Sequence, residues 1–86
     1  MDVRLIVAWN IRRLRVAKQI SQDDLAHNAE VERSYVGYLE RATKNPTILT
    51  LEKLAGALDC EVAAFFTEIP MDAELTEQLP AGRKKT

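Results

Sequence analysis

Apolar residues recur at intervals of three and four along most of this chain of 86 residues, which is the spacing of helices packed by one face. The first predicted helix, about residues 3–18, carries Val7, Ile11 and Leu14 on its inward face. Further helices are predicted at about residues 22–29, 33–41, 48–58 and 62–68. Their inward positions are Leu25, Ala26, Ala29, Val36, Leu39, Leu51, Leu54, Ala55, Leu58, Val62 and Phe65. The pattern predicts an all-α fold.

The second and third predicted helices are separated by a very short turn. Ser21 is a good N-cap, and Asp24 three residues later completes a capping box with Asp in place of Glu or Gln. The next helix begins after Glu32, a weaker capping residue. The inward positions of the unit are Ala26, Val31, Val36 and Leu39. This spacing is typical of a helix-turn-helix, whose second helix enters the major groove of DNA.

The segment from Ile11 to Phe66 resembles the lambda-repressor-like, Xre-type family of DNA-binding domains. The matching elements are Ile11-Arg12 with Leu14-Arg15, Ser21-Gln22 with Leu25-Ala26, Leu39-Glu40-Arg41, Asn45-Pro46-Thr47, Leu54-Ala55 with Ala57-Leu58, and Phe65-Phe66. The resemblance implies a compact five-helix bundle with the helix-turn-helix as helices two and three. The run from Arg33 to Gly37, followed by Leu39-Glu40-Arg41, is most similar to controller proteins of restriction-modification systems and related small dimeric autoregulators.

Two positions depart from the family pattern. The turn inside the motif and the position after the Glu-Arg pair normally carry Gly, because both residues tend to be left-handed. Here they are Glu30 and Ala42. A side chain with a Cβ costs roughly 1 kcal/mol in that conformation. Replacement of Glu30 by Gly is therefore expected to raise the melting temperature.

The outer face of the third predicted helix is the expected DNA-reading surface. We predict base contacts from Arg33, Ser34 and Tyr38, since an Arg at this position can bond both O6 and N7 of guanine. Gly37 weakens its helix and indicates a close approach, either to DNA or to another helix. Arg41 also lies on this face.

Backbone contacts are expected on both sides of that helix. Gln22 begins a helix whose N-terminal N–H groups favour a phosphate. The other candidates are Tyr35, Thr43, Lys44 and Asn45. The ring of Tyr35 can also brace the helix while its hydroxyl meets a phosphate, and His27 is a solvent-facing residue or a weaker backbone contact. The family resemblance further implies a buried ion pair between Arg15 and Glu40, which would fix the angle of the third helix.

The C-terminal part suggests association. Residues 1–69 are predicted to form the DNA-binding domain and 70–86 an extension or tail. Phe66 and Ile69 fall beyond the core face, and with Val62 they form the expected homodimer interface, as the resemblance implies. A short helix after Pro70, carrying Leu75 and Leu79, can cover the apolar residues of the first helix that face away from its core stripe, in cis or from a partner subunit. These residues are Leu5, Trp9 and Val16. A frayed tail is the open alternative.

Charge is distributed unevenly along the chain, although the net charge is only −1. Residues 1–53 hold nine basic and seven acidic side chains, residues 54–80 hold six acidic and no basic ones, and three basic residues follow. Positive charge therefore gathers on the motif half, which suits double-stranded DNA. RNA polymerase is a further candidate partner. The competing interpretation is an antitoxin or another protein-interaction module that uses the same fold.

The sequence gives little support to a disulfide, a metal site, a membrane segment or an enzyme. One Cys and one His provide no disulfide, cysteine zinc cluster or other metal site. Cys60 is expected to be a small core residue, with a redox sensor as the minor alternative. No signal peptide or membrane segment is recognisable, which favours a cytoplasmic protein. No enzyme motif is present, and we expect neither a cofactor nor a small-molecule ligand.

Overall fold

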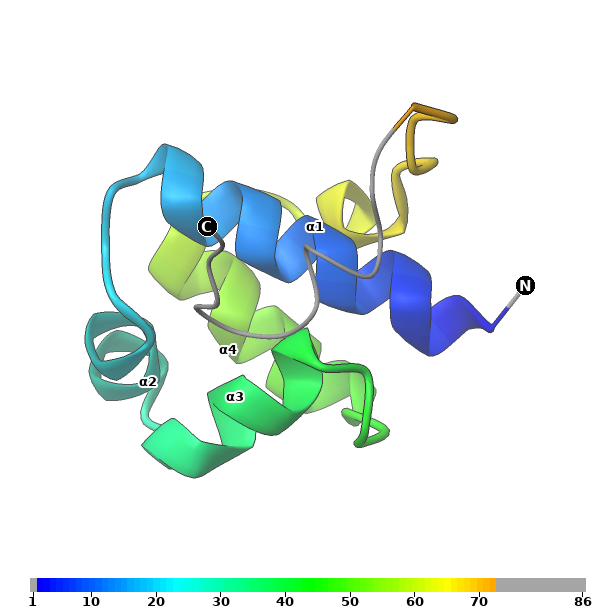
Figure 1. The fold of residues 1–86 in the computed structure, drawn as a ribbon. Coiled ribbons are helices and arrows are strands. Elements are labelled where there is room, and N and C mark those ends of the chain that lie inside the picture. Colours follow the sequence, from blue (N-terminus) through cyan, green and yellow to red (C-terminus); the bar gives the residue numbers. More distant parts are fainter. Residues whose placement is uncertain (1, 73–86) are drawn as a thin grey trace, which may run out of the picture.

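The computed structural model describes residues 2–72 and shows a helical bundle (Figure 1). Its elements are α1 (Val3–Ala17), α2 (Gln22–Ala29), α3 (Arg33–Glu40), α4 (Ile48–Leu58) and the 3-10 helix η1 (Val62–Phe66). The all-α prediction is confirmed, and the predicted limits of the first four helices agree with the structure to within one residue. The fifth element is different: it is a short 3-10 helix, where the sequence analysis expected a helix through Glu68.

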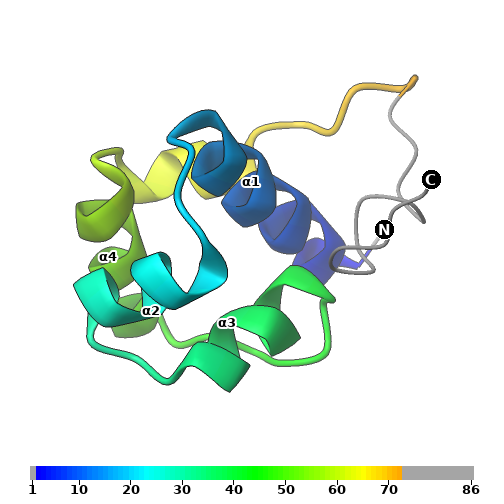
Figure 2. The ribbon, with the colours of Figure 1, turned by 60° about the vertical axis from the view of Figure 1, so that its left-hand side comes forward.

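The helices enclose one core. α1 packs against α3 and η1, while α2 packs against α3 and α4. Figure 2 shows α3 along the side of the molecule opposite η1. The fully inaccessible apolar side chains include Phe65, Ile11, Leu25, Leu54 and Val36, and burial of each such side chain contributes roughly 1.5–3 kcal/mol. Most predicted inward positions are buried, but Leu14, Val31 and Val62 are only partly covered.

Side-chain caps start three of the helices. Ser21 and Asp24 form the predicted capping box of α2, with a distance of 2.9 Å from the Asp24 amide nitrogen to the Ser21 Oγ. Thr47 caps α4 in the same manner. Asp2 caps α1, and its hydrogen bonds from the Arg4 side chain and amide lower the pKa of the exposed carboxyl to about 2. Glu32 provides no side-chain cap to α3, as expected for a weak capping residue.

Each α-helix of the described chain ends in the same backbone motif. After α2, the amide of Glu30 donates to the carbonyl of His27 and that of Val31 to Ala26, which is the Schellman pattern. The equivalent bonds close α1, α3 and α4. The left-handed residues at these four ends are Gln19, Glu30, Ala42 and Asp59. The predicted left-handed conformations of Glu30 (φ 60°) and Ala42 (φ 63°) are confirmed.

A buried amide explains why the fifth element is short. Asn10 is completely inaccessible, and its Nδ2 lies 3.1 Å from the Phe65 carbonyl and 2.8 Å from the Thr67 carbonyl. The same nitrogen lies 2.9 Å from the Ile6 carbonyl. Two carbonyls at the end of η1 are therefore bonded to α1 instead of continuing a helix, and Thr67 is extended. No sequence pattern indicates this role of Asn10.

The second apolar set of α1 is only partly covered. Leu5 and Trp9 are half-buried, whereas Val16 is 49% exposed. The guanidinium of Arg13 lies 5.7 Å from the Trp9 ring centroid. Leu75 and Leu79, the residues expected to cover this set, lie outside the described residues. The packed C-terminal segment and the boundary after residue 69 stay predictions.

Candidate nucleic-acid interface

A buried ion pair fixes α3 against α1. Arg15 donates from Nε to Oε2 of Glu40 at 2.7 Å and from Nη2 to Oε1 at 3.1 Å. The Glu40 side chain is fully inaccessible and that of Arg15 is 13% exposed. Arg15 also donates from Nη1 to the Ile20 carbonyl at 2.9 Å, so the guanidinium binds the segment that leads into α2. Arg15 thus ties α1 to α3 and to the segment before α2.

Gln22 belongs to the same network. Its Nε2 donates to Oε1 of Glu40 at 3.0 Å, so the first residue of α2 is bonded to the last residue of α3. The amide nitrogen of this predicted phosphate contact is thus engaged within the protein. The side-chain oxygen of Gln22 lies 3.8 Å from where a Cβ on Gly37 would be, so this side chain approaches α3 at the buried Gly37.

Gly37 makes room for Arg41. A Cβ at residue 37 would lie 3.3 Å from Nη1 of Arg41, closer than ordinary van der Waals contact. The guanidinium of Arg41, at the C-terminal end of α3, therefore folds back over its own helix. The close approach predicted for Gly37 is thus made by Arg41 and Gln22 of the chain itself.

A group of two cations and a ring borders α3 at its C-terminal end. The Arg41 guanidinium carbon lies 5.2 Å and the Lys44 nitrogen 5.4 Å from the centroid of the Tyr38 ring. Cation–π contacts of this kind are worth about 0.5–1 kcal/mol at exposed sites. Thr43 supports the group by donating its hydroxyl to the Tyr38 carbonyl at 3.0 Å. Two predicted backbone contacts, Thr43 and Lys44, are thereby brought next to a predicted base contact.

The N-terminal end of α3 presents a different arrangement. Arg33 donates from Nε to Oδ1 of Asp23 at 2.8 Å, with side-chain exposures of 62% and 74%. Ser34 is exposed beside it. Tyr35 is partly buried and packs against the core, consistent with a ring that braces the helix. Two of the three positions predicted to read bases, Arg33 and Ser34, are thus exposed at the N-terminal end of α3.

Two residues of this surface were not among the predicted contacts. The contact of Arg41 with Tyr38 depends on how the chain turns after α3. The sequence gives no signal for Asp23, which lies ten residues from Arg33 and on another helix. An acidic residue in the first turn of α2 can be recognised as a partner of Arg33 only when the relative placement of α2 and α3 is known.

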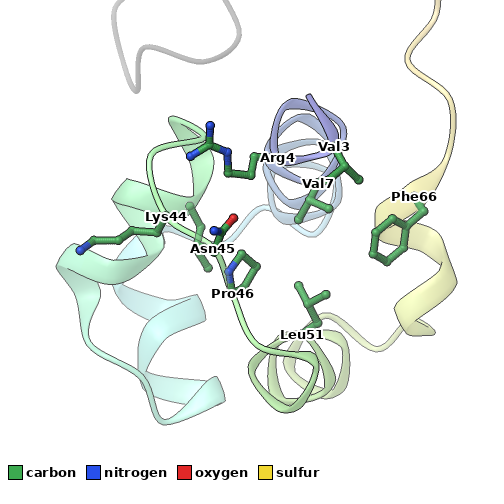
Figure 3. Close-up of a pocket in the computed structure, with 9 residues that line it drawn as sticks. Val3, Arg4, Val7, Lys44, Asn45, Pro46, Leu51 and Phe66 are labelled. Carbon is green, nitrogen blue, oxygen red and sulfur yellow. The ribbon is translucent and has the colours of Figure 1, made fainter. Parts of the chain in front are cut away.

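The predicted dimer residues lie in and after η1, and the groove beside Phe66 extends to Lys44 and Asn45 of the loop after α3. Phe66 is 48% exposed and points into a small groove of about 120 Å³ formed with Val7, Pro46 and Leu51 (Figure 3). Val3 and Asn45 also line this groove. Ile69 is half-buried, and Val62 packs partly against the core. Of the three residues, Phe66 therefore offers the largest exposed apolar surface.

Cys60 is half-buried beside the core, which covers the thiol less completely than expected. Burial is the main cause that raises the pKa of this thiol. Within residues 2–72, no group of His, Cys, Asp and Glu side chains is arranged to hold a metal ion. No helix there combines the length and apolar character needed to cross a membrane.

Comparison with known proteins gives consistent matches. Residues 11–65 match the helix-turn-helix family HTH_3. Control protein C.SmaI of Serratia marcescens is 39% identical over 67 residues, which cover 78% of this chain and 80% of that protein. The crystal structure of the restriction-modification controller protein C.AhdI from Aeromonas hydrophila is similar with a TM-score of 0.72 and 40% identity, covering 73% of this chain and 96% of that one.

A third match includes DNA. The structure of the controller protein C.Esp1396I, a tetramer in complex with its natural 35 base-pair operator, is similar with a TM-score of 0.71. The sequence identity is 30%, and the similarity covers 77% of this chain and 87% of that protein.

Proposed function

The chain belongs to the helix-turn-helix family HTH_3, and from this premise we propose that it is a sequence-specific DNA-binding transcription regulator of the controller type. The observation that carries the proposal is how α3 is held in the fold. Its C-terminal residue Glu40 is fixed by the buried pair with Arg15, while the side chains of Arg33 and Ser34 are exposed at its N-terminal end. A rigid helix with an accessible N-terminal face is what the major groove admits.

The side chains of α3 and its neighbours have two tasks in this proposal. Arg33, Ser34 and Tyr38 read base edges, with Arg33 directed at a guanine. Backbone contacts come from Tyr35 on the same helix, from Gln22 at the start of α2, and from Thr43, Lys44 and Asn45 after α3. These contacts set the position and orientation of the protein on the duplex, and they make affinity depend on salt.

We further propose that the protein works as a homodimer. Half-exposed Phe66 and the groove beside it form the interface, together with Ile69 and Val62. Two symmetric copies would place their α3 helices about 34–36 Å apart and read a palindrome. The controller C.Esp1396I is a tetramer on its operator, so pairs of such dimers on one DNA are compatible with this arrangement. We also propose that the protein is cytoplasmic and autoregulatory, so the DNA upstream of its own gene is the first operator to test.

Fluorescence anisotropy tests the function directly. The protein is titrated onto duplexes tiled across the region upstream of its own gene, beside scrambled duplexes of equal length, between about 50 and 200 mM salt. Tight binding to one tile, with an even number of protein chains at the endpoint, is expected. Equal weak binding to all tiles and to scrambled DNA would contradict sequence-specific recognition and would direct attention to a protein partner such as a toxin.

Sedimentation of Phe66→Glu tests the interface. The substitution places a charge in the groove, and we expect a monomer with reduced affinity for DNA. Leu49→Glu is the control, because Leu49 is also an exposed apolar residue, at 69%, and does not line the groove. A Phe66→Glu protein that stays dimeric would place the interface elsewhere.

A further inference from the structure

The pair of Arg33 and Asp23 joins the first turns of α2 and α3. Asp23 is the second residue of α2, and the capping box of Ser21 and Asp24 fixes the same turn. A carboxylate at a helix N-terminus is also favoured by the helix dipole. Asp23 is thus held by a well-defined helix end, while the Arg33 side chain that it binds extends from another helix.

The choice of Arg33 nitrogen that bonds to Asp23 is important for recognition. The carboxylate accepts from Nε of Arg33. The two terminal nitrogens of a guanidinium carry four of its five N–H groups, and a parallel pair of such groups matches O6 and N7 of guanine. A carboxylate bonded at Nε leaves these terminal groups available and restricts the rotation of the side chain about its long axis.

The negative charge of Asp23 also favours discrimination between the operator and unrelated DNA. With 74% of its side chain exposed, Asp23 contributes little to stability through this pair in the free protein. On DNA the same carboxylate would be brought near phosphates, where an unpaired negative charge is unfavourable. The carboxylate is tolerated only while Arg33 stays beside it, so DNA that draws Arg33 away is penalised.

We propose that Asp23 is a positioning residue for base reading, which holds Arg33 through Nε and sets the direction in which its terminal amino groups meet a guanine. This inference rests on the proposed function. It assigns specificity to a residue of α2 that itself contacts no base.

The experiment measures preference at each base pair. Wild-type protein and the variants Asp23→Asn, Arg33→Ala and Glu32→Gln select from a duplex library with about 20 random base pairs, enough for two half-sites, and the bound DNA is sequenced. Glu32→Gln is the matched control: it removes one negative charge next to Arg33, and Glu32 makes no side-chain capping bond. Circular dichroism melting verifies that each variant is folded.

We expect Arg33→Ala to lose a guanine preference at one position of each half-site, by about tenfold. Asp23→Asn is expected to reduce preference at that same position by about fivefold or more, to leave the other positions unchanged, and to bind unrelated DNA more tightly. Glu32→Gln should bind unrelated DNA more tightly and keep the preference.

Three results would overturn the proposal while leaving the proposed function intact. The first is an Asp23→Asn protein that keeps the wild-type guanine preference. The second is an Asp23→Asn protein that loses preference equally at all positions, as a purely structural role predicts. The third is an Arg33→Ala protein that loses no guanine preference. By contrast, a wild-type protein that enriches no motif at all would refute the proposed function, and this inference with it.

Discussion

Two arginine–carboxylate pairs of nearly equal length lie in contrasting regions of the helix-turn-helix. Arg15 and Glu40, with N···O 2.7 Å, join α1 to α3 in the interior, and the Glu40 side chain is fully inaccessible. Arg33 and Asp23, at 2.8 Å, join α3 to α2 on the outer face, where both side chains are mostly exposed. Geometry alone does not separate these contacts, but burial does.

The difference in burial separates an ion pair that stabilises the fold from one whose loss costs the fold little. Removing one partner of a buried pair leaves an uncompensated charge in a poorly solvated place, whereas water replaces a lost partner at the surface. The interior pair therefore supports the fold by fixing the angle of α3. The outer pair contributes little to folding, so its proposed role is to direct Arg33 on DNA.

The largest expected effect is on the interior pair. Arg15→Ala strands the buried Glu40 carboxylate and should lower the free energy of unfolding by about 3–5 kcal/mol. Urea denaturation followed by circular dichroism measures this loss. A variant with unchanged stability but weaker DNA binding would make Arg15 a phosphate contact and would remove the contrast between the two pairs.

Asn10→Ala extends the comparison to a buried neutral group. The substitution leaves the carbonyls of Phe65 and Thr67 without their donor, and we expect a loss of about 1–3 kcal/mol in the free energy of unfolding. Thr67→Ala is the control, since it removes only the exposed bond from the Thr67 hydroxyl to the Ala64 carbonyl. Equal effects of the two substitutions in denaturant titrations would show that the Asn10 hydrogen bonds do not stabilise the end of η1 against α1.

Glu30→Gly measures how much backbone strain at the turn between α2 and α3 affects stability, for comparison with the exposed Arg33–Asp23 pair. Glu30 has φ 60° and ψ 44°, and relief of its left-handed strain should contribute up to about 1 kcal/mol. The melting temperature should rise by about 4 °C, as scanning calorimetry would show. A fall or no change would mean that the extra freedom of Gly in the unfolded chain offsets the relief.

The smallest expected effect on stability is that of Arg33→Ala. Loss of an exposed pair should change the free energy of unfolding by less than about 0.5 kcal/mol, while sequence preference on DNA falls. Denaturant titration beside the selection experiment measures both quantities. A loss of stability comparable to that of Arg15→Ala would show that exposure does not distinguish the two regions.

Local patterns allowed much of this fold to be predicted. The capping box at Ser21, the short turn and the inward apolar positions all depend on residues close together in the sequence, and the structure has them. The left-handed conformation of Glu30 also followed from a local rule, combined with the family position of a Gly. The family resemblance named Arg15 and Glu40 as partners, which spacing alone does not.

Contacts between distant segments were harder to foresee. Asn10 binds carbonyls 55 and 57 residues away, and this bonding ends η1 where the apolar pattern continues. Asp23 meets Arg33 only because α2 and α3 cross with their first turns adjacent. Such contacts depend on the relative placement of helices, which hydrophobic periodicity does not specify.

The four left-handed residues that end α1 to α4 have a consequence for the lifetime of the protein in a cell. Gln19, Glu30, Ala42 and Asp59 each hold a conformation that costs a side-chain-bearing residue about 1 kcal/mol or more. Each such increment multiplies the transiently unfolded fraction, on which cellular proteases act, by roughly fivefold. Substitution at these helix ends can therefore change the abundance of the protein while the DNA-facing side chains stay the same.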